Sequence, residues 1–192
     1  LERMPENLAL AYQEVFTAID RLRGGRQAVA DASAFRQQIR DAIKASEQQS
    51  RSLGYPAEEI RLATFALVAF LDAVVLSVQN PVFRDWPKKP LQEELFGSFN
   101  AGELFFLNIQ RLSQQSDSAG LADLLEVYLL CLLLGFQGRH SMDGQGELRA
   151  VRDALSQRIR RIRGVREELS PAWKPLAAGN RSLSDPWLKR LL

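Results

Sequence analysis

The chain has 192 residues, of which 46% are hydrophobic and 25% are charged, and its formal net charge at pH 7 is only +2. This composition is typical of a folded globular protein, formed as one domain or as two small ones. A net charge so close to zero does not mark nucleic acid or a membrane as a partner. The single cysteine, Cys131, excludes an intrachain disulfide framework.

Apolar residues recur at helical spacing in the first part of the chain and predict three long helices. The first spans residues 8–22 and ends at a glycine pair. The second spans about 33–53, with Ser33 as its expected N-cap. The third spans about 57–79 and is apolar on nearly every face, which is typical of a central helix. Asp72 interrupts its apolar run, so the sequence predicts a buried helix there rather than a membrane span.

The second part of the chain is divided by prolines and glycines and predicts shorter elements. Residues 80–90 include three prolines and predict a structured loop. Four helices are then expected, at 91–96, 101–112, 121–136 and 147–163. Because no segment alternates between apolar and polar residues with a period of two, the prediction is an all-α fold.

The sequence offers little material for catalysis or metal binding. Its one histidine, His140, lies in the glycine-rich run 135–146 and has no nucleophile elbow as a partner. One histidine and the distant Cys131 cannot supply the usual zinc ligands. The glycine-rich run lacks the GxxxxGK[ST] pattern and follows a helix rather than a strand, which disfavours a phosphate loop. We therefore predict no enzyme activity, no metal and no cofactor.

Asp72 is the most informative carboxylate because it lies in an otherwise apolar helix. A buried carboxylate is costly unless it is paired or hydrogen-bonded. We expect Asp72 to pair with a basic residue, with Arg139 as the first candidate, or to line a groove that a partner uses. General acid–base catalysis by Asp72 would need a second catalytic group, which the sequence does not supply.

The last predicted helix is rich in arginine, and an apolar stripe occupies its other face. The arginines are therefore expected to form a solvated side. Contact with an anionic membrane surface is a functional alternative. Nucleic acid would also use such a stripe, but no aromatic residues interleave with it. The residues concerned are Arg149, Arg152, Arg158, Arg160, Arg161, Arg163 and Arg166.

Aromatic residues gather in and after the proline-rich loop. Some are expected to close the core, and others to form a patch for a partner, because aromatic side chains are enriched at interface hot spots. These residues are Phe83, Trp86, Phe96, Phe99, Phe105 and Phe106.

Five motifs follow one another in an order that resembles the TssL/DotU family of bacterial type VI and related type IVB secretion systems. The resemblance covers roughly residues 8–163, and the last motif is the most specific. The motifs are ALVAFLDAVVL (66–76), Trp86, LQEELFG (91–97), AGELFF (101–106) and LLEVYLLCLLLGFQGR (124–139). The candidate interaction or structural residues in this set are Asp72, Trp86, Glu103, Glu126 and Arg139.

The resemblance implies an all-α domain of two packed helical bundles in a hook-like arrangement, expected here over residues 1–168. It implies a C-terminal membrane helix that this chain does not contain, with residues 169–192 as a proline-containing tail leading to it. The implied partners are a TssM/IcmF-like inner-membrane protein, baseplate components and a second copy of the chain, with no nucleic acid. The expected location is the cytoplasmic face of the bacterial inner membrane.

Two positions depart from the family pattern. Ala73 follows Asp72 where the family often has a glutamate, and His140 follows Arg139 where an aromatic residue is common. Roles that depend on those family residues are not carried over. The expected function is a non-enzymatic scaffold that links the TssM/IcmF-like partner to the baseplate. The alternative is a soluble helical regulator that binds nucleic acid or an acidic surface through its arginine-rich last helix.

Overall fold

The computed structural model describes residues 7–138 and 144–164, and all regular structure within these ranges is helical. The prediction of an all-α fold is confirmed. The predicted boundary between residues 168 and 169 lies outside the described residues. The α-helices are α1 (Leu8–Ala11), α2 (Gln13–Arg23), α3 (Ala32–Ser52), α4 (Ala57–Ser77), α5 (Leu91–Phe96), α6 (Ala101–Ser113), α7 (Ala119–Leu133) and α8 (Gln145–Arg163), and the 3-10 turns are η1 (Pro81–Phe83) and η2 (Trp86–Lys88).

The first predicted helix is in fact two helices, α1 and α2, with a break at Tyr12. Tyr12 is fully buried, and its hydroxyl lies 2.7 Å from Oγ1 of Thr64 on α4. The break therefore lies where the chain is held against the central helix. The predicted N-cap of the second helix was wrong by two residues, because the side chain of Asp31, not Ser33, caps α3. The Asp31 carboxylate accepts a hydrogen bond from the Ser33 amide at 2.8 Å.

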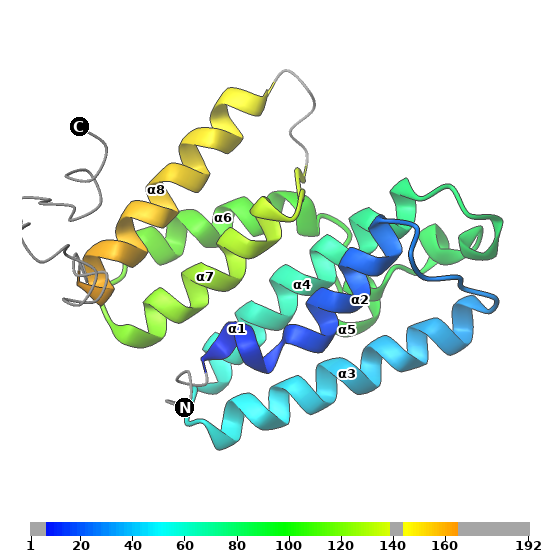
Figure 1. The fold of residues 1–192 in the computed structure, drawn as a ribbon, viewed down its shortest axis with the longest axis horizontal. Helices are drawn as coiled ribbons and strands as arrows, with labels where there is room; N and C mark the ends of the chain where they lie inside the picture. The colour runs from blue at the N-terminus through cyan, green and yellow to red at the C-terminus, as the bar shows by residue number, and fades with distance from the viewer. Residues whose placement is uncertain (1–6, 139–143, 165–192) are drawn as a thin grey trace, which may run out of the picture.

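Helix α4 is the centre of the molecule (Figure 1). It packs against α2, α3 and α5 of the first half of the chain and against α6 and α7 of the second. By length and composition α4 could cross a membrane, but 72% of its most apolar window is buried within the fold. This burial on nearly all faces explains why its sequence shows no polar side.

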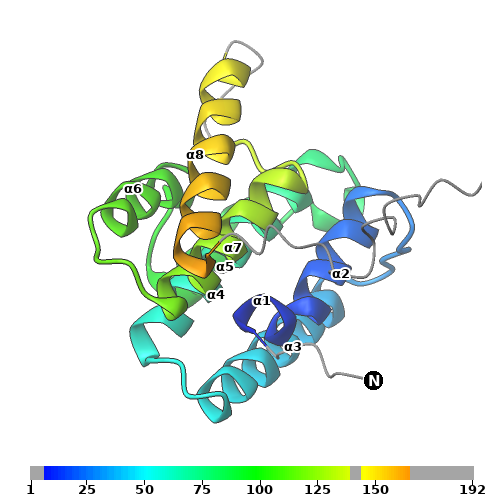
Figure 2. The ribbon, with the colours of Figure 1, turned by 60° about the vertical axis from the view of Figure 1, so that its left-hand side comes forward.

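The helices form two groups, α1–α5 and α6–α8, which meet where α4 packs against α6 and α7 and where α1 packs against α7. One continuous hydrophobic core includes buried side chains from both groups. Helix α8 packs on α7, and in both views it lies on the side of the molecule opposite α3 (Figures 1 and 2). The predicted association of two helical groups is thus confirmed for the described residues.

Three of the six aromatic residues expected to close the core or form a partner patch are buried in the core. Phe83, Trp86 and Phe105 are each less than 5% exposed. Phe99, just before α6, has 69% of its surface exposed. Of the predicted aromatic patch, only Phe99 and the half-buried Phe96 and Phe106 are therefore accessible to a partner.

Candidate interaction site and the contacts that shape it

The buried carboxylate of Asp72, on α4, accepts three hydrogen bonds from the segment that follows this helix. Its Oδ1 atom accepts from Nε1 of Trp86 at 2.7 Å and from the amide of Leu91 at 3.0 Å. Its Oδ2 atom accepts from the amide of Gln92 at 2.8 Å. The residue is only 1% exposed. These bonds satisfy the carboxylate in the way that a buried charge requires.

The two bonds from the amides of Leu91 and Gln92 show that Asp72 acts as an N-terminal cap for α5. The first amides of a helix have no acceptor inside that helix, and they form the positive end of its dipole. Helix α5 begins after Pro90, whose side chain cannot cap it. Asp72 supplies the missing acceptor from a different helix.

Arg36 of α3 covers this cap and ties it to the same short helix. Its guanidinium lies 4.0 Å from the ring centroid of Trp86, in cation–π geometry. It also donates to Glu94 at 3.0 Å and to the carbonyl of Lys89 at 2.8 Å. We call Asp72, Trp86, Arg36 and the amides of Leu91 and Gln92 the Asp72 centre. Burial raises the pKa of the Asp72 carboxyl, while the amide of Gln92, the Trp86 indole, the amide of Leu91 and the charge of Arg36 oppose that rise.

The predicted partnership of Asp72 with Arg139 stays a prediction, because Arg139 lies outside the described residues. What the sequence reasoning missed is that backbone amides are partners of this carboxylate.

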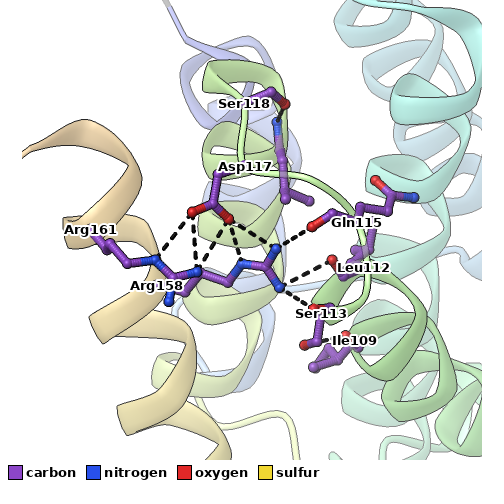
Figure 3. A network of polar contacts seen from close by, with 9 residues as sticks. Ile109, Leu112, Ser113, Gln115, Asp117, Ser118, Arg158 and Arg161 are labelled. Carbon is purple, nitrogen blue, oxygen red and sulfur yellow. Dashed lines mark hydrogen bonds and ion pairs between the residues drawn. The ribbon is translucent and has the colours of Figure 1, made fainter.

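A second cap lies at the other end of the domain, where Arg158 of α8 reaches the end of α6 (Figure 3). The Arg158 guanidinium donates to the carbonyls of Leu112, Ser113 and Gln115. These carbonyls lie at the negative end of α6, where a cation is favourable. The Arg158 side chain is only 14% exposed.

Asp117 completes this second cap by binding two arginines of α8. Its carboxylate accepts hydrogen bonds from Arg158 at 3.0 Å and from Arg161 at 3.1 Å (Figure 3). The hydrogen bonds from Arg161 and then Arg158 hold the pKa of the Asp117 carboxyl below its usual value. We call Arg158, Arg161, Asp117 and the three carbonyls the Asp117 centre.

Arg163, at the end of α8, joins α8 to α7. It donates to Glu126 at 2.8 Å and to Asp123 at 2.7 Å. Glu126 also accepts from Asn7 at 2.9 Å, and Asp123 accepts from the hydroxyl of Tyr55 at 2.7 Å. The two acids that interrupt the apolar run of α7 therefore hold α1, α8 and the turn before α4 against it.

The expectation of a solvated arginine face on the last helix holds for Arg149, Arg160, Arg161 and Arg163, which are exposed, but not for Arg158, which is only 14% exposed. Arg158, Arg161 and Arg163 are bound to carboxylates of the α6–α7 loop and of α7. Arg149 and Arg160 are exposed and make no ion pair with a described residue. Fewer arginines are therefore available for nucleic acid or a membrane than the sequence suggests.

The predicted site residues do not form one cluster. Asp72 and Trp86 are in direct contact, whereas Glu126 belongs to the contacts of Arg163. Glu103 is exposed in the first turn of α6. Arg139 and His140 lie outside the described residues.

The described residues hold no cluster of histidine, cysteine, aspartate or glutamate suited to a metal ion. Cys131 is fully buried, and that burial raises the pKa of its thiol. A thiol in this setting is a poor nucleophile. The ionisable side chains of the Asp72 centre, the Asp117 centre and the Arg163 contacts act as caps and ties between helices.

These features define an all-helical domain in which buried and half-buried charges hold short helices in place. The chain belongs to the DotU family, since it matches the model for "Type VI secretion system protein DotU" over residues 7–191. It is thus a component of a type VI secretion system. The matched region includes most of the predicted tail.

Two solved structures support the family and the fold. The cytoplasmic domain of TssL from Acinetobacter baumannii is 31% identical with a TM-score of 0.73, over 82% of this chain and 99% of that chain. SciP/TssL of the type VI secretion system of enteroaggregative Escherichia coli 042 is 27% identical with a TM-score of 0.65, over 79% of this chain and 86% of that chain. No curated protein sequence gives a significant match.

Proposed function

We propose that this chain is a non-enzymatic adaptor of the type VI secretion membrane complex, which links a TssM/IcmF-like inner-membrane protein to the cytoplasmic baseplate. The family match over residues 7–191 carries this proposal. The use of charged side chains as helix caps supports it, because these caps stiffen a surface without supplying a reaction centre.

The proposal includes attachment to the inner membrane through a C-terminal helix of the full-length protein, with the described domain on the cytoplasmic side. It also includes a homodimer of the full-length form. One relative is described as a cytoplasmic domain, which supports this orientation. The proposal includes no cofactor and no nucleic acid.

Affinity purification of the tagged full-length protein from detergent-solubilised membranes tests the proposal. Both a TssM/IcmF-like protein and a baseplate component are expected to co-purify, and a strain lacking the gene is expected to lose type VI secretion. Failure of both partners to co-purify, with secretion intact in the deletion strain, contradicts the adaptor function.

Substitution of two exposed arginines of α8 tests the alternative function, a regulator that binds nucleic acid through this helix. Arg149 and Arg160 are exposed and make no ion pair with a described residue, so Arg149→Ala with Arg160→Ala should not alter the fold. A salt-sensitive affinity for duplex DNA that falls in this variant would support the regulator instead of the adaptor. The adaptor predicts no such affinity and unchanged co-purification.

A further inference from the structure

Two shallow hollows lie side by side where α3, α4, α5 and α6 meet, and they share two lining residues, Arg61 and Phe96. The hollow toward α6 has a volume of about 200 Å³, and the hollow toward α3 has a volume of about 350 Å³. Leu62, Phe65 and Leu104 give the first an apolar floor, and Ile43 does so for the second. We call the two hollows with Phe96 between them the basic–aromatic surface.

Cations without partners surround these hollows. Lys44, Arg61 and Arg111 make no ion pair or side-chain hydrogen bond with any described residue, and all three are exposed. Of the two lining acids, Glu47 forms an ion pair with Arg51 at 3.4 Å, so only Glu58 offsets these three cations. The rim therefore carries a local positive charge that the chain itself leaves unneutralised, although its net charge is close to zero.

Two exposed apolar side chains belong to this surface, Leu95 in the lining of the second hollow and Phe99 next to the first hollow's Ser98 in the chain. Leu95 is 40% exposed and Phe99 is 69% exposed, on either side of the turn that ends α5. Apolar groups exposed in this way beside a charged rim are typical of a protein-binding surface.

The position of this surface depends on the Asp72 centre. Asp72 holds the first amides of α5, and the Gln92 side chain of the same helix accepts a hydrogen bond from the Ala101 amide at 2.8 Å, at the start of α6. These two bonds set where the end of α5, with Phe96, lies against α4 and α6. The Phe96 ring packs edge-on against Phe65, with centroids 5.2 Å apart.

We infer that the basic–aromatic surface binds an acidic segment of a protein partner that places one apolar side chain in each hollow. We choose an acidic segment because the three unpaired cations of the rim attract carboxylates. The apolar floors of both hollows favour a peptide with apolar side chains over a continuous phosphate backbone or the headgroups of an anionic lipid surface. This inference rests on the proposed adaptor function and adds the chemistry of one partner.

Photo-crosslinking in cells tests it with the full-length protein. A photoreactive phenylalanine analogue replaces Leu95, and mass spectrometry identifies the peptide attached to it. The expected product is a peptide of net negative charge with apolar residues, from a component of the secretion apparatus. A product with a second copy of this chain, a lipid, a nucleic acid, or a neutral or basic peptide overturns the inference, and so does the absence of any product.

A charge-reversal pair gives the matched control. Arg61→Glu with Arg111→Glu should reduce the crosslinked product at least tenfold, whereas Arg149→Glu with Arg160→Glu on α8 should leave it unchanged. The conservative pair Arg61→Lys with Arg111→Lys, which keeps the charge, should retain most of the product and so exclude a folding defect as the cause. Equal losses in both charge-reversal pairs overturn the inference.

The crosslink separates this inference from the adaptor function. An acidic peptide from a protein outside the secretion apparatus would support the surface and count against the adaptor. If the protein with unaltered Arg61 and Arg111 gives no crosslink at position 95 but still co-purifies with both partners, the inference about the surface is wrong and the adaptor function is retained.

Discussion

The Asp72 centre and the Asp117 centre both cap the end of a helix with a charged side chain from another helix. The first caps an N-terminus and the second a C-terminus, and the two differ in their exposure to water. Asp72 caps the positive start of α5 from α4, and Arg158 caps the negative end of α6 from α8. Asp72 in the first cap is 1% exposed, whereas in the second the capping Arg158 is 14% exposed and its partners Asp117 and Arg161 are 40% and 66% exposed. A charge in a buried cap has no water to replace a lost partner, so the buried cap should carry more of the stability.

The largest effect is expected from Asp72→Ala, which leaves the Trp86 indole and two amides without an acceptor. We expect a loss of about 3 kcal/mol or more in the free energy of unfolding, measured by urea denaturation. The exposed neighbour Ala73 is the matched control, and Ala73→Glu should change stability by less than about 0.5 kcal/mol. Equal effects at the two positions would contradict the buried cap.

Arg158→Ala should have the next largest effect, because it removes the donor to three carbonyls at the end of α6. We expect a loss of about 2 kcal/mol in the same measurement. Arg160→Ala, at an exposed position of the same helix, is expected to fall within about 0.5 kcal/mol of the wild type. If Arg158→Ala destabilises the chain more than Asp72→Ala, the order of the two caps is reversed.

Salt should weaken the exposed ion pairs of α8 but not the hydrogen bonds of the buried Asp72. A double-mutant cycle with Arg163→Ala and Glu126→Ala is expected to give a coupling energy below about 1 kcal/mol at low salt, because both side chains are partly exposed. In 1 M NaCl, where the Debye length is only about 3 Å, this coupling should shrink toward zero. The effect of Asp72→Ala should not change with salt.

The smallest effect, and one of opposite sign, is expected from Glu59→Gln. Its Oε2 atom is buried without a hydrogen-bond partner, and burial, then the nearby Asp123, raise the pKa of the Glu59 carboxyl. The folded state therefore holds the Glu59 proton more tightly than the unfolded state. Stability contributed by this group falls as the pH rises from about 4.5 through the raised pKa. Above that pH range, Glu59→Gln should raise the free energy of unfolding by less than about 1 kcal/mol. The variant should also lack this part of the pH dependence of stability. A free energy of unfolding below that of the wild type at pH 7 would contradict the prediction.

The sequence predicted the helices well because their apolar positions follow the helical period. Residues 91–96 were predicted with the observed ends, and the centrality of α4 followed from its lack of a polar face. The break at Tyr12 was missed because it depends on a hydrogen bond to Thr64, more than fifty residues further along the chain.

The candidate site could be predicted only in part. That Asp72 needed a partner followed from the cost of a buried charge, but a backbone amide has no signature in a sequence. The arginines of α8 looked solvated because their acids lie in a loop and on α7, about forty residues away. Local patterns can indicate that a charged group needs a partner, and only the fold can say which atoms are within reach.

Hydrogen exchange at single amides tests the central claim, that Asp72 caps α5 from another helix, most directly. The first amides of a helix normally exchange fast because they have no acceptor within the helix. In the wild type the amides of Leu91 and Gln92 should be protected, and in Asp72→Asn their protection should fall at least tenfold while that of α8 is retained. Unchanged protection at Leu91 and Gln92, or an equal loss along α8, would contradict the claim.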